Sequence, residues 1–380
     1  MRVGLGCTML AKGLAQGGID GIGAYTQALG RQLSADPAVD LLPVSFGVPA
    51  SADFPRFAHP PSILPVYAPM AAIAALGPFV FRGNKRLGRE VDLFHAPDHL
   101  VPRFSGFPVV ATLMDAVPLS HPEWIRARFG KLKSRLWRHA AQWADHILTI
   151  SEYSKSDIVK YFGISPERIT VTPLGVDERY FERIDAVQKA EIIRRHQLPE
   201  QFYLFVGTLQ PRKNVARILD AHAALPLPLQ QEIPLVIVGR AGWGCDALVA
   251  RLNDSALAGR VYWLNYLPDV EVRALLQTAQ ALVFPSLCEG FGLPVVEAFA
   301  SGLPVITANT TALPEVAGEA ALLVDPLDVG AISDAMRQVA TVSAMATTLA
   351  AAGMRRARQL SWAACTEQTL AVYRKVLAGH

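Results

Sequence analysis

The sequence predicts an α/β protein built from two Rossmann-like domains that face each other across a cleft. A length of 380 residues favours two domains over one. Short apolar strands alternate with helical patterns, and a second series of this alternation begins near residue 203. Such alternation is typical of parallel sheets. Hydrophobic residues make up 51% of the chain and charged residues 18%, so two large cores can be buried. Ligands of open parallel sheets bind beyond the carboxyl ends of the strands, so we expect the ligand in the cleft.

The first predicted domain spans residues 1–180. Its expected elements are a strand over 2–9, a helix over 21–35, strands over 91–97 and 107–115, a long amphipathic helix around 123–145, and a strand followed by a helix over 146–163. A polar, mixed stretch near 175–200 is expected to link the domains. Strands bounded by helices in this order indicate parallel pairing.

The second predicted domain spans residues 181–360. Its expected elements are strands over 203–210, 234–242, 260–268 and 281–286, helices near 213–224, 246–255 and 270–278, a helix from about 293, and two short strands over 303–309 and 320–326. Residues 361–380 are predicted to form a last helix, which could close the second domain or pack back on the first.

Composition excludes several classes of protein. Four scattered cysteines without a C-x-x-C pair, and histidines without metal-ligand spacing, argue against a disulfide framework or structural zinc and fit a reducing cytosol. The start of the chain becomes polar too quickly for a signal peptide. The longest apolar run, residues 62–81, contains Pro65, Pro69 and Pro78, so we interpret it as a buried or membrane-surface segment, not a membrane span.

A stretch with the sequence EGFGLPVVE, residues 289–297, is the first candidate for a ligand site. It follows an apolar strand, and Gly290 and Gly292 would let the backbone approach a ligand closely. Pro294 suits the first turn of a helix. Glu289 would then lie in a bare loop and Glu297 on the helix, an arrangement that suits a ligand rich in hydroxyl groups.

Two further stretches could bind phosphate. In GTLQPRKN, residues 207–214, Arg212 and Lys213 emerge at the end of a strand beside Gly207, and their guanidinium and ammonium groups suit a diphosphate. The alternative is that both are ordinary solvent-exposed side chains at the start of a helix. In GGIDGIGAYTQAL a glycine-rich turn at Gly23 opens a helix whose N-terminus could meet phosphate, although a simple tight turn explains it nearly as well.

Taken together, these stretches resemble the family-4 retaining glycosyltransferases. The resemblance runs in the family's order from Gly21 to about Pro326, and its most diagnostic part is the pair of glutamates eight residues apart. It implies a GT-B fold, a nucleotide-sugar donor, and transfer with retention at the anomeric carbon. It also implies that the first domain binds the acceptor and the second the donor.

The resemblance assigns a role to each candidate residue. Glu297 would accept hydrogen bonds from the ribose, and Glu289 would lie beside the donor sugar. The backbone N–H groups of Gly290, Phe291 and Gly292 would meet the sugar hydroxyls. Arg212 and Lys213 would hold the diphosphate, approached by Gly23 from the other domain, and the loop at Tyr266 would recognise the base. Cations so placed stabilise the charge on a leaving diphosphate.

No metal and no cofactor are expected, because the sequence contains no Asp-x-Asp and the two cations can replace a metal at the diphosphate. One position departs from the family, which usually has His-Asp where this chain has Met114-Asp115. Methionine forms only weak hydrogen bonds. Either His95 or His121 replaces the histidine, the acceptor differs, or activity is reduced; Asp115 remains a candidate donor-binding residue.

A peripheral membrane contact is expected from basic and apolar residues in the first domain. The sequence RGNKRLGR, residues 82–89, directly follows the apolar run, and residues 125–143 mix Arg126, Arg128 and Lys131 with aromatic residues. Such stretches can lie on an anionic membrane. Residues 1–180 carry 19 Lys/Arg against 15 Asp/Glu, whereas residues 181–380 carry 17 against 18. The alternative is a solvated helix with one buried stripe. Nucleic acid is a poor alternative partner, because no known binding module is present.

The leading hypothesis is a glycosyltransferase at the cytoplasmic face of the inner membrane. It would transfer mannose or a 6-deoxyhexose such as rhamnose from a GDP-linked donor to a lipid-linked saccharide, in the synthesis of a surface polysaccharide such as an O-antigen or exopolysaccharide. The alternatives are a nucleotide-sugar epimerase and a non-catalytic subunit that binds the nucleotide sugar. Glu289, Glu297, Arg212 and Lys213 together favour the transferase.

Overall fold

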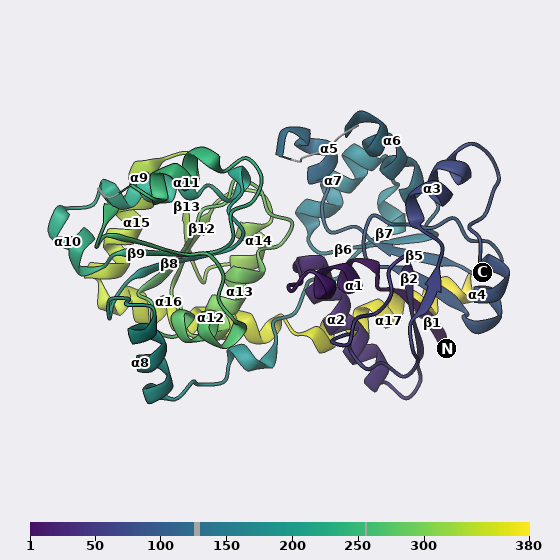
Figure 1. Ribbon diagram of the computed structural model, residues 1–380, viewed down its shortest axis with the longest axis horizontal. Helices are drawn as coiled ribbons and strands as arrows, with labels where there is room; N and C mark the ends of the chain where they lie inside the picture. The colour runs from purple at the N-terminus through teal and green to yellow at the C-terminus, as the bar shows by residue number, and fades with distance from the viewer. Residues whose placement is uncertain (125–129, 255–256) are drawn as a thin grey trace. The chain divides into compact units, whose positions relative to one another are not determined.

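The computed structural model describes residues 1–124, 130–254 and 257–380, and this part of the chain forms two compact units (Figure 1). The first unit runs from Met1 to Gly175, apart from a short stretch after Pro122, and includes Trp362–His380. The second unit comprises Val176–Ser361. The chain therefore passes from one unit to the other at residues 175–176, five residues before the predicted boundary at residues 180–181.

The first unit is built on a seven-stranded parallel sheet with the strand order β3-β2-β1-β4-β5-β6-β7. Its strands are β1 (Arg2–Gly6), β2 (Asp40–Phe46), β3 (Ser62–Leu64), β4 (Leu93–Ala96), β5 (Val109–Thr112), β6 (His146–Thr149) and β7 (Ile169–Val171). Its helices are α1 (Thr8–Ala15), α2 (Gly21–Ala35), α3 (Tyr67–Ala75), α4 (Asn84–Glu90), α5 (Val117–Ser120), α6 (Gly130–Ala141), α7 (Glu152–Phe162) and α17 (Trp362–Ala378). Short 3₁₀ turns lie at η1 (Pro122–Trp124) and η2 (Pro166–Arg168).

The last helix, α17, is fixed to this sheet by a buried polar network. His95 on β4 lies with Nδ1 2.6 Å from the Tyr373 hydroxyl of α17 and with Nε2 2.7 Å from Thr112 Oγ1 on β5. Tyr25 of α2 extends the network to Thr112 at 2.9 Å. Burial lowers the pKa of His95 to about 3, so the ring is neutral and can both donate and accept. The network explains why α17 belongs to the first unit although the chain reaches it last.

The second unit repeats the architecture with a six-stranded parallel sheet of order β10-β9-β8-β11-β12-β13. Its strands are β8 (Tyr203–Val206), β9 (Leu235–Val238), β10 (Val261–Leu264), β11 (Ala281–Phe284), β12 (Val305–Ala308) and β13 (Leu322–Val324). Its helices are α8 (Ala186–Arg195), α9 (Val215–Ala223), α10 (Leu227–Glu232), α11 (Asp246–Leu252), α12 (Asp269–Leu276), α13 (Leu293–Ala300), α14 (Leu313–Ala317), α15 (Val329–Thr341) and α16 (Ser343–Gln359), with 3₁₀ turns at η3 (Glu178–Tyr180) and η4 (Pro211–Lys213).

Strand order reverses direction at β8 and β11 in the second sheet, so the loops that leave these two neighbouring strands diverge and leave room for a ligand. The loop after β8 carries Arg212 and Lys213, and the loop after β11 carries Glu289. The fold thus brings together two candidate stretches that lie more than 70 residues apart in sequence.

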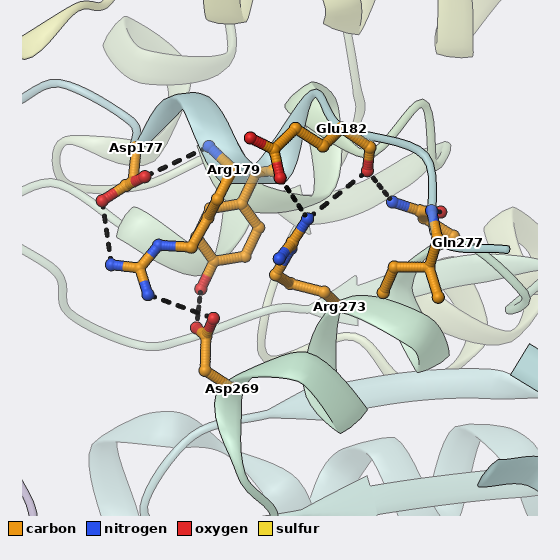
Figure 2. Close-up of polar contacts among 8 residues, drawn as sticks. Asp177, Arg179, Glu182, Asp269, Arg273 and Gln277 are labelled. Atoms are coloured by element: carbon orange, nitrogen blue, oxygen red, sulfur yellow. Dashed lines mark hydrogen bonds and ion pairs between the residues drawn. The ribbon is translucent and has the colours of Figure 1, made fainter. Parts of the chain in front are cut away.

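The segment that enters the second unit is attached to α12 by ion pairs and hydrogen bonds (Figure 2). Arg179 pairs with Asp177 at 2.8 Å and with Asp269 at 3.2 Å. Arg273 pairs with Glu182 at 3.3 Å, and the Gln277 side chain donates to the Glu182 carbonyl at 2.7 Å. These contacts hold the start of the second unit against the helix that flanks the candidate site.

Most strands and helices expected in the second unit lie within a few residues of their predicted positions, but one strand expected in the first unit is shorter than predicted. The predicted strand over 2–9 ends at Gly6, and α1 begins at Thr8. The helix expected around 123–145 is described only as α6, because residues 125–129 lie outside the described part. The stretch 175–200, expected to be a linker, contains α8, whose first turn is capped by the Asp185 carboxylate.

The apolar run 62–81 folds as β3 and α3. No helix among the described residues is both long enough and apolar enough to cross a membrane.

Candidate active site

The candidate site of the second unit is a carboxylate held between two cations. Glu289 Oε1 lies 2.6 Å from Lys213 Nζ, and Oε2 lies 2.9 Å from a guanidinium nitrogen of Arg212. The same guanidinium nitrogen donates to the Cys288 carbonyl at 3.0 Å. The Lys213 ammonium also lies 4.8 Å from the centre of the Phe284 ring. The structure therefore brings three of the predicted site residues into direct contact.

Burial and charge act in opposite directions on Glu289. Its side chain is 8% exposed, against 11% for Lys213 and 24% for Arg212. Burial raises the pKa of this carboxyl, but Lys213 and Arg212 outweigh burial, and the pKa lies below its ordinary value. Glu289 is therefore ionised at neutral pH. Two cations facing one carboxylate leave an excess of positive charge, which suits a phosphate-bearing ligand.

The two loops are tied together by their backbones and by Asn214. The Leu287 N–H donates to the Arg212 carbonyl at 2.8 Å. The Asn214 amide donates to the carbonyls of Pro285 at 2.9 Å and Pro326 at 2.7 Å, so one buried side chain joins the ends of β11 and β13. The Thr311 hydroxyl accepts from the Glu289 N–H at 3.2 Å. Asn214 and Thr311 were not predicted as site residues; for Asn214 the one available signal is its position next to Lys213.

At two positions of the site, Gly292 and Gly239, the backbone leaves no room for a side chain. Gly292 caps α13 with φ 105°, and a Cβ there would lie 2.7 Å from Leu313 Cδ2. A Cβ on Gly239 would lie 1.9 Å from the carbonyl oxygen of Gly207, so these two loops pass each other at backbone distance. Gly290, Phe291 and Gly292 are buried between Glu289 and α13. Their predicted contacts with donor hydroxyls remain a prediction.

Glu297 lies on α13, beside the segment that enters the unit. It is partly buried, and the nearby Tyr180 side chain acts to lower its pKa. The Tyr180 hydroxyl also donates to Asp269 at 3.3 Å, next to the Arg179 ion pair of Figure 2. Burial raises the pKa of Glu297 to about 7, and Asp269 adds to that rise. Glu297 therefore changes its charge near neutral pH, unlike Glu289.

Tyr266 follows β10 and is 56% exposed. The Arg240 guanidinium stacks on its ring, with 4.3 Å between the guanidinium carbon and the ring centre. The Trp263 indole N–H donates to the Gly239 carbonyl at 2.9 Å and fixes the neighbouring loop. A flat, exposed cation–aromatic pair at the end of a strand can stack on an aromatic ligand.

The remaining candidate residues lie in the first unit. Gly23 is buried in the first turn of α2, and its N–H donates to the Asp20 side chain at 2.8 Å. The Asp115 carboxylate accepts from the Val117 N–H at 3.0 Å, and Met114 beside it is buried. His95 has no exposed surface and both ring nitrogens are engaged, so it cannot replace the missing histidine as a substrate contact. The roles of Gly23 and Asp115 remain predictions.

Two other histidines lie near Asp115. His121 Nδ1 lies 2.9 Å from Ser120 Oγ. Both His121 and Asp115 lie close enough to Asp157 to affect its pKa. The His99 ring stacks on Phe162, with 5.9 Å between ring centres, and Asp115 acts to raise its pKa against the larger effect of burial. His121 therefore stays a candidate replacement for the missing histidine, and His99 is a second histidine near Asp115.

Family models match both halves of the chain. The model described as Glycosyltransferase Family 4 matches residues 19–180, and the one described as Glycosyl transferases group 1 matches residues 188–356. The O-antigen chain mannosyltransferase B of Escherichia coli is 34% identical over 283 residues, which cover 74% of each chain. The chain belongs to glycosyltransferase family 4. The MMP alpha-(1->4)-mannosyltransferase of Mycolicibacterium hassiacum is 33% identical over 296 residues, covering 72% of this chain and 66% of that protein.

Solved structures identify the fold as GT-B. The glycosyltransferase resembles the sucrose-phosphate synthase of Thermosynechococcus elongatus with a TM-score of 0.75 and 19% identity over 100% of both chains. It resembles WaaG, a glycosyltransferase involved in lipopolysaccharide biosynthesis, with a TM-score of 0.70 and 19% identity over 97% of this chain and 98% of that chain. Identities at this level show the fold alone. The predicted fold class is confirmed.

The described residues contain no group of three or more His, Cys, Asp or Glu side chains that could hold a metal ion. The predicted metal independence of the glycosyltransferase is untested by this observation.

Proposed function

We propose that this glycosyltransferase transfers mannose or a 6-deoxyhexose such as rhamnose, with retention and without a metal, from a GDP-linked donor to a lipid-linked saccharide. The observation that carries the proposal is the contact of Arg212 and Lys213 with Glu289 at the switch point of the second sheet. A buried arrangement with excess positive charge fits a donor diphosphate better than it fits an uncharged ligand.

The geometry favours a front-face mechanism over a covalent one. Both oxygens of Glu289 are bound by cations, and its lowered pKa makes the carboxylate a poor nucleophile. In the proposed step the bond between the anomeric carbon and the diphosphate oxygen breaks, and the acceptor oxygen bonds to the same face. The acceptor proton passes to the departing diphosphate. Arg212 and Lys213 stabilise the negative charge on that diphosphate, and Glu289 orients the cations and faces the sugar.

The identity of the donor sugar is proposed from the relatives. Two relatives, 34% and 33% identical over 74% and 72% of the chain, carry the name mannosyltransferase, one of them for an O-antigen chain. These names support a hexose of the mannose type and an acceptor that belongs to a surface polysaccharide. Glu297 is proposed to accept from the ribose hydroxyls, and the stacked pair of Arg240 and Tyr266 to contact the base.

We place the enzyme on the cytoplasmic face of the inner membrane, in peripheral contact with it. The four cysteines, all within the described part of the chain, are buried and form no disulfide, which suits a reducing compartment. A lipid-linked acceptor would be presented at the membrane surface, so the enzyme would meet it there.

The test is transfer of radiolabelled sugar from GDP-mannose to lipid-extractable acceptors in membranes of the organism that encodes the chain. The purified wild type is expected to label the lipid fraction and to form an α-linked product from the α-linked donor. Glu289→Ala is expected to lower kcat by about 100-fold or more, because loss of one preorganised polar contact at the reacting centre costs that much. Glu319→Ala changes an exposed glutamate of the same unit and is the matched control.

Met114 supports one other candidate, a non-catalytic subunit that binds the nucleotide sugar, because methionine occupies the position at which the family usually has histidine. Binding of GDP-mannose without any turnover by the wild type would favour that candidate. Full activity of Glu289→Ala would disprove the catalytic assignment.

A further inference from the structure

The surface around α3 carries an unusual concentration of exposed apolar side chains. Among the described residues, fifteen large hydrophobic side chains are exposed, and six of them fall within residues 63–80. These six residues, which we call the α3 patch, are Ile63, Val66, Ile73, Leu76, Phe79 and Val80. Leu76 is 85% exposed. Scattered apolar residues are normal on a protein surface, but a local cluster of this kind marks an interaction site.

The helix itself is apolar on all sides. Its sequence, YAPMAAIAA, has Tyr67 as its only polar side chain. Tyr67, Met70, Ala71 and Ala74 follow helical spacing and are buried against the sheet. The opposite side carries Ile73, with Val66 before the helix and Leu76 after it, and this side faces outward. A helix that is hydrophobic all round is normally buried all round, so the outward side lacks a covering surface.

Exposed cations border the α3 patch. Arg82, Lys85, Arg86 and Arg89 lie on or just before α4, with the spacing of one helix face, and all are exposed. This helix adjoins β3, because Arg86 lies 3.4 Å from Ser62 Oγ and Gly83 packs against Leu64. Between Phe54 and Arg89 the sequence has five Lys/Arg and no Asp or Glu. Glu90 follows at the end of α4 and pairs with Arg86 at 3.4 Å, which leaves an excess of positive charge on this helix.

A second basic element lies beside α3. The two helices α3 and α6 pack together, and both lie on the upper side of the sheet in Figure 1. Lys133, Arg135 and Arg138 of α6 are exposed. Arg126 and Arg128, which the sequence analysis also considered, lie outside the described residues, as does the side chain of Lys131. Cations therefore flank the apolar surface on α4 and occur again on the neighbouring α6.

We propose that the α3 patch and the basic face of α4 together form a docking surface for an anionic lipid membrane. Apolar side chains would enter the boundary between headgroups and acyl chains, and the cations would contact lipid phosphates. The charge complementarity favours a membrane over a second copy of this positively charged surface. The surface belongs to the first unit, whereas Glu289 belongs to the second. It rests on the peripheral membrane contact of the proposed function, to which it assigns named residues. Vesicle binding requires neither a donor nor transfer, so it tests the surface separately from catalysis.

The test is flotation of the purified full-length chain with vesicles of phosphatidylcholine alone or of phosphatidylcholine mixed with an equal part of phosphatidylglycerol. The wild type is expected to float with the mixed vesicles and to be released at high salt. Ile73→Glu/Leu76→Glu should reduce the partition coefficient more than tenfold. Lys85→Gln/Arg89→Gln should reduce it about 25-fold, or about fivefold per charge.

The matched control is Val187→Glu/Leu327→Glu, which changes two apolar residues of the second unit that are exposed to a similar extent, 75% and 61% against 55% and 85%. It should float like the wild type. No flotation of the wild type, or equal loss in the control and the α3 variant, would overturn the proposal. So would equal binding to both kinds of vesicle, since that removes the role of the cations.

Sedimentation velocity tests the other occupant of the α3 patch. A wild type that is dimeric, with Ile73→Glu/Leu76→Glu monomeric, would assign the patch to a second copy of the chain and overturn the proposal; a monomeric wild type supports it. Nucleotide binding by the same variants separates the docking surface from the proposed transferase function. A variant that no longer floats but still binds nucleotide has lost only the membrane surface. A wild type that floats but binds no nucleotide contradicts only the proposed function.

Discussion

Replacing Lys213 by methionine probes the buried ion pair on which the candidate site depends. The substitution keeps the length and most of the apolar stem of the side chain but removes the ammonium, which lies 2.6 Å from Glu289. Of the two cations that contact Glu289, Arg212 then remains, and the pKa of Glu289 is expected to rise. The carboxylate stays buried, so part of its desolvation is no longer compensated.

The size of the effect follows from burial. Breaking a buried ion pair by removing one partner costs about 3–5 kcal/mol, because an uncompensated charge is left behind. Lys213 and Glu289 are 11% and 8% exposed, so solvent screens their interaction weakly. Arg212 still contacts Glu289 at 2.9 Å, which places the expected loss at the lower end, about 3 kcal/mol.

A double-mutant cycle isolates the pair. The free energy of unfolding is measured by denaturation in urea at pH 7 for the wild type, Lys213→Met, Glu289→Gln and the double variant. Removing both charges should cost less than the sum of the single losses by at least about 1 kcal/mol.

The matched control is the cycle of Arg251→Met with Asp220→Asn. That pair has the same N–O distance of 2.6 Å, but both side chains are 45% exposed. Its coupling should lie between 0 and about 1 kcal/mol, as for other surface pairs. Additive losses at Lys213 and Glu289, or equal coupling in the two cycles, would refute the reasoning that burial makes the pair strong.

Three further predictions concern charge and packing. Because burial raises the pKa of Glu297 to about 7, the folded state holds this proton more tightly than the unfolded state, so this group's contribution to stability falls as pH rises from about 4.5 to about 7. Denaturation curves of Glu297→Gln should lack that loss, and curves that match the wild type would contradict the shift. If ionised Glu297 accepts from ribose, titration calorimetry should show GDP affinity rising from pH 6 to pH 8 in the wild type, and a flat profile would count against the ribose contact. Tyr373→Phe leaves the buried Nδ1 of His95 without its 2.6 Å partner and should cost about 1–3 kcal/mol in urea denaturation, whereas an unchanged midpoint would mean that α17 is held by packing alone.

The sequence was most informative where the chemistry is local. The strand over Ala281–Phe284, the bare loop at Gly290 and Gly292, and the helix from Leu293 follow one another in the chain, so periodicity, glycine and proline predicted them directly. The meeting of Arg212, Lys213 and Glu289 was predictable as well, because parallel strands present their carboxyl ends at one edge of a sheet.

Contacts between distant segments could not be predicted in the same way. Tyr180 reaches Asp269 and Glu297 across about 90 and 117 residues, respectively, and nothing in the sequence near residue 180 indicates this pairing. Asn214 joins the ends of two strands through backbone carbonyls, which leave no trace in the sequence. His95 was a candidate substrate contact until its position beneath α17 showed that Tyr373 and Thr112 occupy both ring nitrogens.

The central claim is that the two cations and Glu289 form the diphosphate site of a metal-free nucleotide-sugar enzyme. The most direct measurement is the thermal midpoint of the wild type and of Lys213→Met with saturating GDP, UDP, dTDP or ADP, each with and without EDTA. A ligand at about one hundred times its dissociation constant adds roughly 2.7 kcal/mol of stability. We expect the thermal midpoint to rise with GDP, to the same extent with and without EDTA, and to rise less in Lys213→Met. A rise with UDP or dTDP instead would overturn the proposed donor, and no rise with any nucleotide would contradict the central claim.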